Sequence, residues 1–463
     1  MELITTDICI IGAGSGGLSV AAGAVQMGAR VVLVEGHKMG GDCLNYGCVP
    51  SKALLAQAKL AHLRAKPGPE SYAEAMAHVR ATIAAIAPHD SAERFTALGV
   101  QVIQGYARFT SPTEVVVEDT RIRARRVVIA TGSRPLVPDL PGLKALPYLT
   151  NETIFDLTEC PRHLLVLGAG PIGMELAQAH CRLGARVTVI DAAQPLARED
   201  REAAEIVIEQ LRREGVEVVE RAEVETFGGR AGAIECQVKG GTIFTGTHLL
   251  VAAGRVPNLE HLDLDKAGVA VDHVGIRVGP GLRSTNRRVY AIGDAAGQGQ
   301  FTHLAGYHAG LVIRSMLFGL PTRARSDHIP RVTYTDPELA QIGLTEAAAR
   351  KQHGPRLSVH KISYDQIDRA QAEGRTDGFL KLMAVGGRPV GVTIVGAGAG
   401  EALAPWALAV ASRLKLSAIA GCVLPYPTRA EIGKRAAGAY FSPKLFDNPV
   451  VKRVVRTVQR WLP

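Results

Sequence analysis

The sequence reads Asp7-Ile-Cys-Ile-Ile-Gly-Ala-Gly-Ser-Gly-Gly17 near its start and repeats the pattern as Leu164-Leu-Val-Leu-Gly-Ala-Gly-Pro-Ile-Gly173. Each stretch is an apolar run, a glycine turn and the start of an alanine-rich segment. A second apolar run then ends in an acid, at Glu35 and Asp191, each 23 residues after the first glycine. Two complete units of this kind predict two βαβ dinucleotide-binding folds, whereas a lone Gly-x-Gly-x-x-Gly is weak evidence.

The glycines of such a unit have separate physical roles. The first permits a tight turn, the second lets the backbone approach a pyrophosphate, and the third lets the helix pack closely on the strand. The pyrophosphate lies at a helix N-terminus, where free N–H groups and the helix dipole favour an anion. The acid accepts hydrogen bonds from a ribose. A glycine turn in an ordinary βαβ unit is the alternative, and the two matching acids disfavour it.

The bulk composition is that of a globular protein with several domains. The chain has 463 residues, of which 47% are hydrophobic and 21% charged, and domains of about 100–200 residues predict two to four of them. The net charge of +9 is scattered along the chain, so we expect a solvated surface and no nucleic-acid partner.

Cysteine usage and the N-terminus indicate a cytoplasmic location. The seven cysteines are sparse and odd in number, which is not typical of an extracellular disulfide framework. The chain starts without a basic, cleavable leader, and no apolar run reaches the ~18 residues of a membrane span.

The remaining pattern places the other elements and one boundary. Helical stretches are predicted over 53–65, 71–87 and 302–318, and strands over 100–103, 115–117, 127–130 and 289–292. The proline-rich stretch 135–147 indicates a domain boundary. Near Ile329 the pattern changes to alternating strands and helices without a glycine fingerprint, which predicts a third domain.

The segment Gly40-Gly-Asp-Cys-Leu-Asn-Tyr-Gly-Cys-Val-Pro-Ser-Lys52 is the most informative about chemistry. Cys43 and Cys48 lie five apart in a glycine-flanked turn that opens a helix, where a thiol pKa is lowered. Two unrelated thiols or half a metal site are the alternatives. No second Cys/His pair stands at metal-ligand spacing, so no metal is expected.

This segment resembles the redox site of the pyridine nucleotide–disulfide oxidoreductases, which include dihydrolipoamide dehydrogenase, glutathione reductase and mercuric reductase. Further motifs follow in the family's order: Ala130-Thr-Gly132, Ala253-Gly-Arg-Val-Pro-Asn258, Tyr290-Ala-Ile-Gly-Asp294, Thr333-Tyr-Thr-Asp-Pro-Glu-Leu-Ala340 and Gly343-Leu-Thr-Glu346. The resemblance covers nearly the whole chain. It implies an α/β fold with an FAD-binding Rossmann-like domain (1–149 and 276–328), an NAD(P)-binding one (150–275) and a C-terminal α+β dimerisation domain (329–463).

The resemblance also implies roles for residues at matching positions. Cys48 would face the flavin as a charge-transfer thiolate, Cys43 would exchange with substrate, and Lys52 and Glu175 would pair beside the flavin near the nicotinamide. The implied contacts to the ADP part and ribityl chain of FAD are Gly12, Gly14, Gly17, Glu35 and Asp294. Those to the nicotinamide dinucleotide are Gly168, Gly170 and Gly173. Gly41, Thr131, Gly132, Gly254 and Ala305 complete the cofactor-binding set.

The second acid bears on which nicotinamide is used. Asp191 would accept a ribose 2′-OH and repel a 2′-phosphate, which favours NADH. Arg186 and Arg198 flank the predicted site and leave NADPH possible.

One position departs from the family's pattern. Many members end with His-Pro-Thr-x-x-Glu, whose His is the acid–base for thiol exchange across the dimer, whereas this chain reads Tyr426-Pro-Thr-Arg-Ala-Glu431. A free Tyr titrates near ~10, so it is a poor base at neutral pH. This disfavours ordinary lipoamide or glutathione turnover. Alternatively, Tyr426 is a packing residue, and water or Glu431 handles the proton.

Mercuric reductases resemble the chain in having this tyrosine, but they typically carry a C-terminal cysteine pair, whereas the last cysteine here is Cys422. Cys422 is interpreted either as a third thiol near Tyr426 or, more commonly for such a residue, as a buried helix cysteine.

The last residues predict an amphipathic helix. Valines from Val450 to Val458 fall on one stripe with Trp461 and Leu462, and Lys452, Arg453, Arg456 and Arg460 fall opposite. Packing within a homodimer is the first expectation for this helix, and contact with an anionic membrane surface is the alternative.

Together these features predict a homodimeric FAD enzyme. Electrons would pass from NADH through flavin and Cys43/Cys48 to a small-molecule or protein-borne disulfide or thiol-bound substrate, as in dihydrolipoamide dehydrogenase or mercuric reductase. The rival hypotheses are direct reduction of quinone, metal or oxygen at the flavin, and a membrane-attached redox partner.

Overall fold

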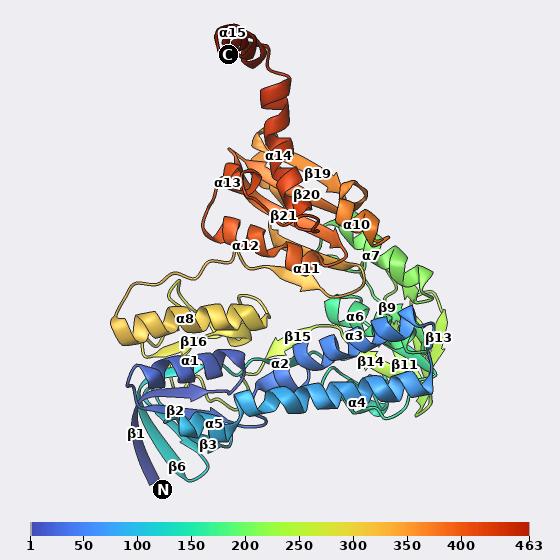
Figure 1. The fold of residues 1–463 in the computed structure, drawn as a ribbon. Coiled ribbons are helices and arrows are strands. Elements are labelled where there is room, and N and C mark those ends of the chain that lie inside the picture. The colour runs from blue at the N-terminus through green and yellow to red at the C-terminus, as the bar shows by residue number, and fades with distance from the viewer. Residues whose placement is uncertain (1, 463) are drawn as a thin grey trace. The chain divides into compact units, whose positions relative to one another are not determined.

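The computed structural model describes residues 2–462 and shows the predicted α/β fold (Figure 1). The chain divides into two compact units. Unit 1 comprises the residues up to Ala192 together with Val219–Ser326, and unit 2 comprises Ala193–Val218 and the residues from Asp327 onward. No helix in the described part of the chain is long and apolar enough to cross a membrane.

The first sheet of unit 1 is the predicted first dinucleotide fold. Its strands run in the order β3-β2-β1-β6-β5-β4, with β16 also paired to β6. Strands β3, β2, β1, β6 and β16 pair in parallel, and β4 and β5 form antiparallel pairs at the edge. The bounds are β1 (Glu2–Ile11), β2 (Val31–Glu35), β3 (Gln101–Gln104), β4 (Ala107–Ser111), β5 (Glu114–Val117), β6 (Thr120–Ile129) and β16 (Val289–Ala291).

Helices α1 (Ser15–Gln26) and α8 (Thr302–Phe318) lie side by side on this sheet. Small residues on α1 make the close approach possible. A Cβ added at Gly16 would lie 3.2 Å from the Cβ of Ala305, and one at Gly23 would lie 2.6 Å from Ile313. The helix predicted over 302–318 is confirmed at those bounds.

The other helices of unit 1 around the redox segment also match the prediction in type. Those predicted over 53–65 and 71–87 are α3 (Cys48–Leu63) and α4 (Pro69–Ile86), so α3 begins earlier than its apolar pattern indicated. The reason is that Cys48 and the next residues lack apolar periodicity but still form its first turn. The short helices are α2 (Gly41–Asn45) and α5 (Ala92–Ala97).

The second dinucleotide fold repeats the first. Strands β9, β8 and β14 pair in parallel, and α6 follows β8 as α1 follows β1. A three-stranded antiparallel sheet, β11-β12-β13, and the pair β15–β7 complete unit 1. The bounds are β7 (Ser133–Pro135), β8 (His163–Leu167), α6 (Pro171–Arg182), β9 (Arg186–Ile190), β10 (Glu217–Val219), β11 (Val224–Arg230), β12 (Ala233–Val238), β13 (Ile243–Gly246), β14 (His248–Val251) and β15 (Arg255–Pro257).

Unit 2 is built on a five-stranded antiparallel sheet in the order β17-β18-β21-β20-β19. Its core packs Trp406 and Tyr364 against the sheet, and both are fully buried. The strands are β17 (Arg331–Thr333), β18 (Glu338–Gly343), β19 (Ser358–Ser363), β20 (Phe379–Val385) and β21 (Arg388–Gly396). The helices are α7 (Arg201–Arg213), α9 (Glu346–His353), α10 (Asp368–Ala372), α11 (Ala399–Ala402), α12 (Ala404–Ala411), α13 (Leu416–Ala420), α14 (Glu431–Phe446) and α15 (Pro449–Trp461).

A buried lysine explains why α7 belongs to unit 2 although its sequence lies beside β9. Lys381, on β20, is 5% exposed and its Nζ lies 3.0 Å from an oxygen of Asp200, the N-cap of α7. The same Nζ lies 3.0 Å from Glu202 and 2.8 Å from Glu346. One cation therefore joins α7, α9 and the sheet.

Replacing this lysine tests how far the cluster holds unit 2 together. In Lys381→Met, the three carboxylates lose their shared cation, and removing one partner of a buried ion pair costs about 3–5 kcal/mol. We expect a clear fall in the midpoint temperature at which unit 2 unfolds. Circular dichroism during heating measures this midpoint. Lys351→Met, at an exposed lysine of α9, should leave the midpoint nearly unchanged. Equal midpoints for both variants would show that the cluster contributes little.

Candidate active site

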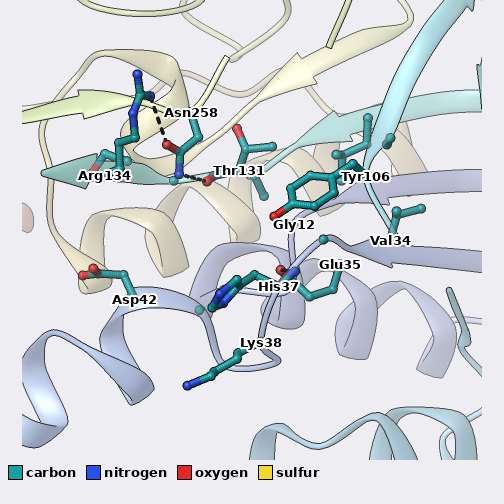
Figure 2. A pocket seen from close by; sticks show the side chains of 18 of the residues that line it. Gly12, Val34, Glu35, His37, Lys38, Asp42, Tyr106, Thr131, Arg134 and Asn258 are labelled. Atoms are coloured by element: carbon teal, nitrogen blue, oxygen red, sulfur yellow. Dashed lines mark hydrogen bonds between the residues drawn. The ribbon is translucent and has the colours of Figure 1, made fainter. Parts of the chain in front are cut away.

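A cavity of about 720 Å³ opens where the strands β1, β2 and β6 end (Figure 2). The predicted residues that line it are Gly12, Gly14, Glu35, Gly41, Thr131 and Gly132. Figure 2 shows Asn258 and Arg134 at one side of the cavity, and Asn258 donates a hydrogen bond from Nδ2 to the Thr131 carbonyl at 3.1 Å. The cavity is thus enclosed by chain segments that are far apart in sequence, and both polar and apolar residues line it.

The glycine turn in this cavity has the geometry that a bound pyrophosphate requires. Gly12 has φ +105°, and an added Cβ would lie 2.4 Å from the Ala130 carbonyl oxygen. A Cβ at Gly17 would lie 1.9 Å from the Gly12 carbonyl oxygen. At Gly14 it would meet only one atom, at 3.9 Å, so the second glycine alone leaves room for a ligand.

The acid at the end of β2 holds this turn in place. Glu35 accepts hydrogen bonds from the backbone N–H of Ala13 at 2.6 Å and of His37 at 2.7 Å. The cavity, the open glycine and the acid together fit an FAD, whose phosphates would face the N-terminus of α1.

The second turn repeats this geometry. An added Cβ would lie 2.5 Å from the Ala252 carbonyl oxygen at Gly168 and 2.0 Å from the Gly168 carbonyl oxygen at Gly173, whereas at Gly170 it would meet nothing within 4 Å. Asp191 accepts a hydrogen bond from the Ala169 N–H at 2.6 Å, as Glu35 does in the first turn. The residues present therefore fit a second dinucleotide.

Cys43 and Cys48 lie in two successive helices. Cys43 lies in α2 and is partly buried, and Cys48 is the first residue of α3 and is exposed. The hydroxyl of Thr302, at the start of α8, lies 3.5 Å from the Cys48 sulfur. No group of His, Cys, Asp and Glu that fits a metal ion occurs among residues 2–462.

The surroundings of the two thiols separate their acidities. Cys43 donates a hydrogen bond to Cys48, which lowers the pKa of Cys48 to about 6, and the Thr302 hydroxyl and the Lys52 charge act in the same direction. The same interaction raises the pKa of Cys43, and burial adds to the rise. At neutral pH the pair therefore favours a Cys48 thiolate beside a Cys43 thiol.

Lys52 and Glu175 form the ion pair that their positions implied. The Nζ of Lys52, one turn into α3, lies 2.7 Å from an oxygen of Glu175 on α6. Glu175 is 6% exposed, so its carboxylate depends on this cation. The pair joins the redox helix to the helix of the second glycine turn.

An arginine network behind the redox segment was not predicted. Arg255 lies 2.9 Å from Asp42, the neighbour of Cys43, and donates hydrogen bonds to Ser133 Oγ at 2.8 Å and to Asn151 at 3.3 Å. The motif at Ala253–Asn258 pointed to Gly254 and contains this arginine. Asp42 lies within the quoted redox segment and Thr302 begins a predicted helix, but their contacts with Arg255 and Cys48 gave no sequence signal, since each contact joins distant segments.

Asp294 lies at the end of this network. Its Oδ2 accepts a hydrogen bond from Ser133 at 2.5 Å, and burial raises the pKa of its carboxyl group. The preceding Gly293 donates its N–H to His308 Nδ1 at 3.2 Å, and Ala305 packs close to Gly293. Asp294 and Ala305 therefore lie in unit 1, which also contains the first glycine turn.

Tyr426 and Glu431 lie in unit 2. The Tyr426 hydroxyl donates a hydrogen bond to Asp368 at 2.8 Å, and this carboxylate raises the pKa of the phenol. Tyr426 is 70% exposed, so it is not packed within its own chain. Glu431 begins α14 and has one buried carboxylate oxygen without a hydrogen-bond partner.

The interpretation of Cys422 as a buried helix cysteine is wrong. The residue follows the end of α13 and is exposed, because the helix stops at Ala420 and the chain continues in a loop.

Comparison with known proteins shows one family over both units. Residues 6–309 match the family Pyridine nucleotide-disulphide oxidoreductase, and residues 329–437 match its dimerisation domain. A mercuric reductase of Acidithiobacillus ferrooxidans is 34% identical over 452 residues, which are 94% of this chain and 82% of that protein. A dihydrolipoyl dehydrogenase of Thermus scotoductus is 34% identical over 461 residues, 94% of this chain and 97% of that protein.

Solved structures give the same result. The HOCl-induced flavoprotein disulfide reductase RclA of Escherichia coli, as its Cu(II) complex, matches with a TM-score of 0.86 and 26% identity. The match covers 94% of this chain and 99% of that one.

The contact between Thr302 and Cys48 leads to a test. In Thr302→Val, the hydroxyl that helps to lower the Cys48 pKa is lost, so the thiolate should form at higher pH than in the parent. Thiolate ultraviolet absorbance of the reduced protein, titrated with pH, measures the midpoint of thiolate formation. Thr302→Ser keeps the hydroxyl and should keep the midpoint. An unshifted midpoint in Thr302→Val would contradict the assigned role.

Proposed function

Because the chain belongs to the pyridine nucleotide–disulphide oxidoreductase family, we propose that it passes an electron pair from NADH, by way of FAD and Cys43/Cys48, to a disulfide or thiol-bound substrate. Enzymes of this family use FAD and NAD(P)H for electron transfer to a disulfide. The observation that carries the proposal is the pair formed by Cys43 in α2 and Cys48 at the start of α3, with the Thr302 hydroxyl 3.5 Å from the Cys48 sulfur and the pKa of Cys48 lowered by its hydrogen bond with Cys43.

The cofactors would occupy the two glycine turns. FAD would be held by Gly12, Gly14, Gly17, Glu35 and Asp294, with Gly41, Thr131, Gly132 and Ala305 around it. The nicotinamide dinucleotide would lie over Gly168, Gly170, Gly173 and Gly254. When bound, the two cofactors supply hydride transfer and deliver the electron pair to the cysteines. The corresponding domains are 1–149 with 276–328 for FAD, 150–275 for NAD(P) and 329–463 for dimerisation.

The protein's own thiols then carry out the exchange. Cys43 first loses its proton to solvent and then attacks, as the thiolate, one sulfur of a substrate disulfide. The substrate S–S bond breaks, a mixed disulfide forms with Cys43, and the other sulfur leaves as a thiolate. The Cys48 thiolate attacks the Cys43 sulfur, which closes the Cys43–Cys48 disulfide and releases the second substrate thiolate. The substrate gains two electrons, the cysteine pair loses two, and the released thiolates take protons from solvent.

The charge at the second turn supports NADH as the electron donor. Asp191 already accepts the Ala169 N–H, which fixes its carboxylate beside the turn where a ribose would lie. A carboxylate in that place accepts a 2′-OH and repels a 2′-phosphate.

The environment of Tyr426 supports a particular kind of substrate. We propose a homodimer in which Tyr426 and Glu431 line the substrate cleft of the other subunit. A phenol whose pKa is raised by Asp368 neither accepts nor readily gives a proton at neutral pH. Substrates whose leaving group needs no proton suit such a site: disulfides of acidic thiols and metal ions held by thiolates. The sparse, odd set of cysteines supports action in the reducing cytoplasm.

An anaerobic titration of the FAD-loaded protein with NADH, followed by absorbance, tests the electron route. We expect a long-wavelength charge-transfer band at two electrons per flavin, because the Cys48 thiolate would lie against the flavin. NADPH should give the same band only at much higher concentration, about tenfold or more, because the carboxylate of Asp191 repels its extra phosphate. Bleaching of the flavin without a band would contradict coupling to the cysteines.

Replacing Cys43 separates the proposal from direct reduction at the flavin. Cys43→Ser should abolish NADH-dependent disulfide reduction, because the mixed disulfide no longer forms. Reduction of a quinone or oxygen should persist in this variant, which shows that FAD is bound and reduced. Disulfide reduction that survives in Cys43→Ser would favour the alternative function, an NAD(P)H reductase that acts at the flavin alone.

The missing histidine gives a test by gain of activity. In Tyr426→His, an imidazole would supply the general acid that an alkyl disulfide needs, so kcat/KM for oxidised lipoamide should rise about tenfold to a hundredfold at neutral pH. Turnover of an aromatic disulfide, whose thiolate leaves without a proton, should change little. Tyr426→Phe is the matched control and should behave like the parent with both substrates. Loss of aromatic-disulfide turnover in Tyr426→Phe would mean that the phenol does take part.

A further inference from the structure

Helix α15 (Pro449–Trp461) separates apolar and basic side chains completely. At 100° per residue, the apolar side chains from Val450 to Leu462 fall within an arc of about 140°, and the four bases fall within about 100° on the other side. Asn448 caps the helix by accepting the N–H groups of Val450 and Val451, and Pro449 occupies its first turn. The start of this helix is therefore determined by its own cap residue and proline.

The apolar face of α15 is not covered within the chain. No residue of α15 in the described part of the chain is buried, Val454 is 56% exposed and Trp461 is 82% exposed. Figure 1 shows α15 at the tip of α14, beyond the end that packs on the sheet of unit 2. Leu445 and Phe446, at the end of α14, are exposed as well. A helix face this apolar needs a partner.

The charges of the segment indicate what the partner is. Lys452, Arg453, Arg456 and Arg460 are all basic, and no acidic residue occurs from 448 to the end of the sequence. A helix with bases on its polar face and a tryptophan with aliphatic side chains on the other lies in the interface of a membrane whose lipids are anionic. A protein core would accept the valines but would not complement four like charges at their flank.

The family's own interface does not account for this helix. The match to the dimerisation domain ends at residue 437, within α14, and α15 follows it. The part of the chain that matches the dimerisation domain therefore does not include this helix.

We propose that α15 docks the protein on the surface of an anionic phospholipid bilayer. The valines, Trp461 and Leu462 enter the boundary between headgroups and acyl chains, and the bases contact lipid phosphates. The helix is 13 residues long and lies along the surface without crossing the bilayer. This attachment goes beyond the redox function and does not depend on it.

Vesicle flotation of the full-length, FAD-loaded protein tests the attachment. The probes are vesicles of phosphatidylcholine and vesicles containing about one third phosphatidylglycerol. We expect binding to the anionic vesicles, weakened by added salt, and little binding to the neutral ones.

Two matched double variants locate the contact. Val454→Ser with Val458→Ser removes apolar surface without changing charge, and should weaken binding to anionic vesicles about tenfold or more. Thr457→Ser with Gln459→Ser also introduces two serines without changing charge, but it does so outside the apolar arc. This variant should bind within about twofold of the parent. Unchanged NADH oxidation in solution shows that both variants are folded.

Tryptophan emission gives a second readout. The chain has two tryptophans, and Trp406 is 1% exposed whereas Trp461 is 82% exposed. Anionic vesicles should shift the emission to shorter wavelength in the parent but not in Trp461→Phe.

Three results would overturn the proposal: no binding to anionic vesicles, equal binding by the two double variants, or an emission already shifted without vesicles. The last result, with a larger mass that falls to the mass of the dimer in Val454→Ser with Val458→Ser, would mean that another copy of this chain covers the helix.

Discussion

The ion pair between Lys52 and Glu175 is the constraint on which the rest of unit 1 depends. Cys48 starts α3, Lys52 follows one turn later, and Glu175 lies in α6 just after the second glycine turn. Because Glu175 is nearly buried, it requires the cation, and α3 is held where Lys52 meets α6. The ion pair therefore holds the helix that begins with Cys48 against the helix that follows the second glycine turn.

The sequence predicted those features of unit 1 that depend only on residues close together in the chain. The glycine turns and their acids follow from steric rules acting within about 25 residues, and the structure has them as expected. The redox segment was predicted to open a helix, but the periodic pattern alone placed the helical stretch from residue 53, because polar and small residues in the first turn of α3 carry no periodicity. Contacts over long separations were missed. Thr302 meets Cys48 across 254 positions, and Arg255 meets Asp42 from another motif. Only the tertiary fold creates such pairs.

The two thiols have opposed acidities, so they differ in which of them carries negative charge at neutral pH. A lowered Cys48 pKa stabilises negative charge on one sulfur, and the raised Cys43 pKa keeps its proton until exchange begins. In unit 2 the same electrostatic rule acts on a phenol. Asp368 makes Tyr426 a fixed hydrogen-bond donor, so that position offers a polar surface but no proton. If Tyr426 faces substrate, as we propose, this position differs from a histidine because it supplies no proton to a leaving group.

The acids at the ends of β2 and β9 have a consequence for how coenzyme preference evolves. Each carboxylate accepts the N–H of the residue between the first two glycines of its own turn. Asp191 therefore supports the turn structurally, in addition to the selection of the ribose that we propose for it. A lineage that exchanges it for a neutral residue to admit a phosphorylated coenzyme also removes this support. The effect of such a change therefore depends on the residues around it, and a compensating contact to the Ala169 N–H has to arise before or with it.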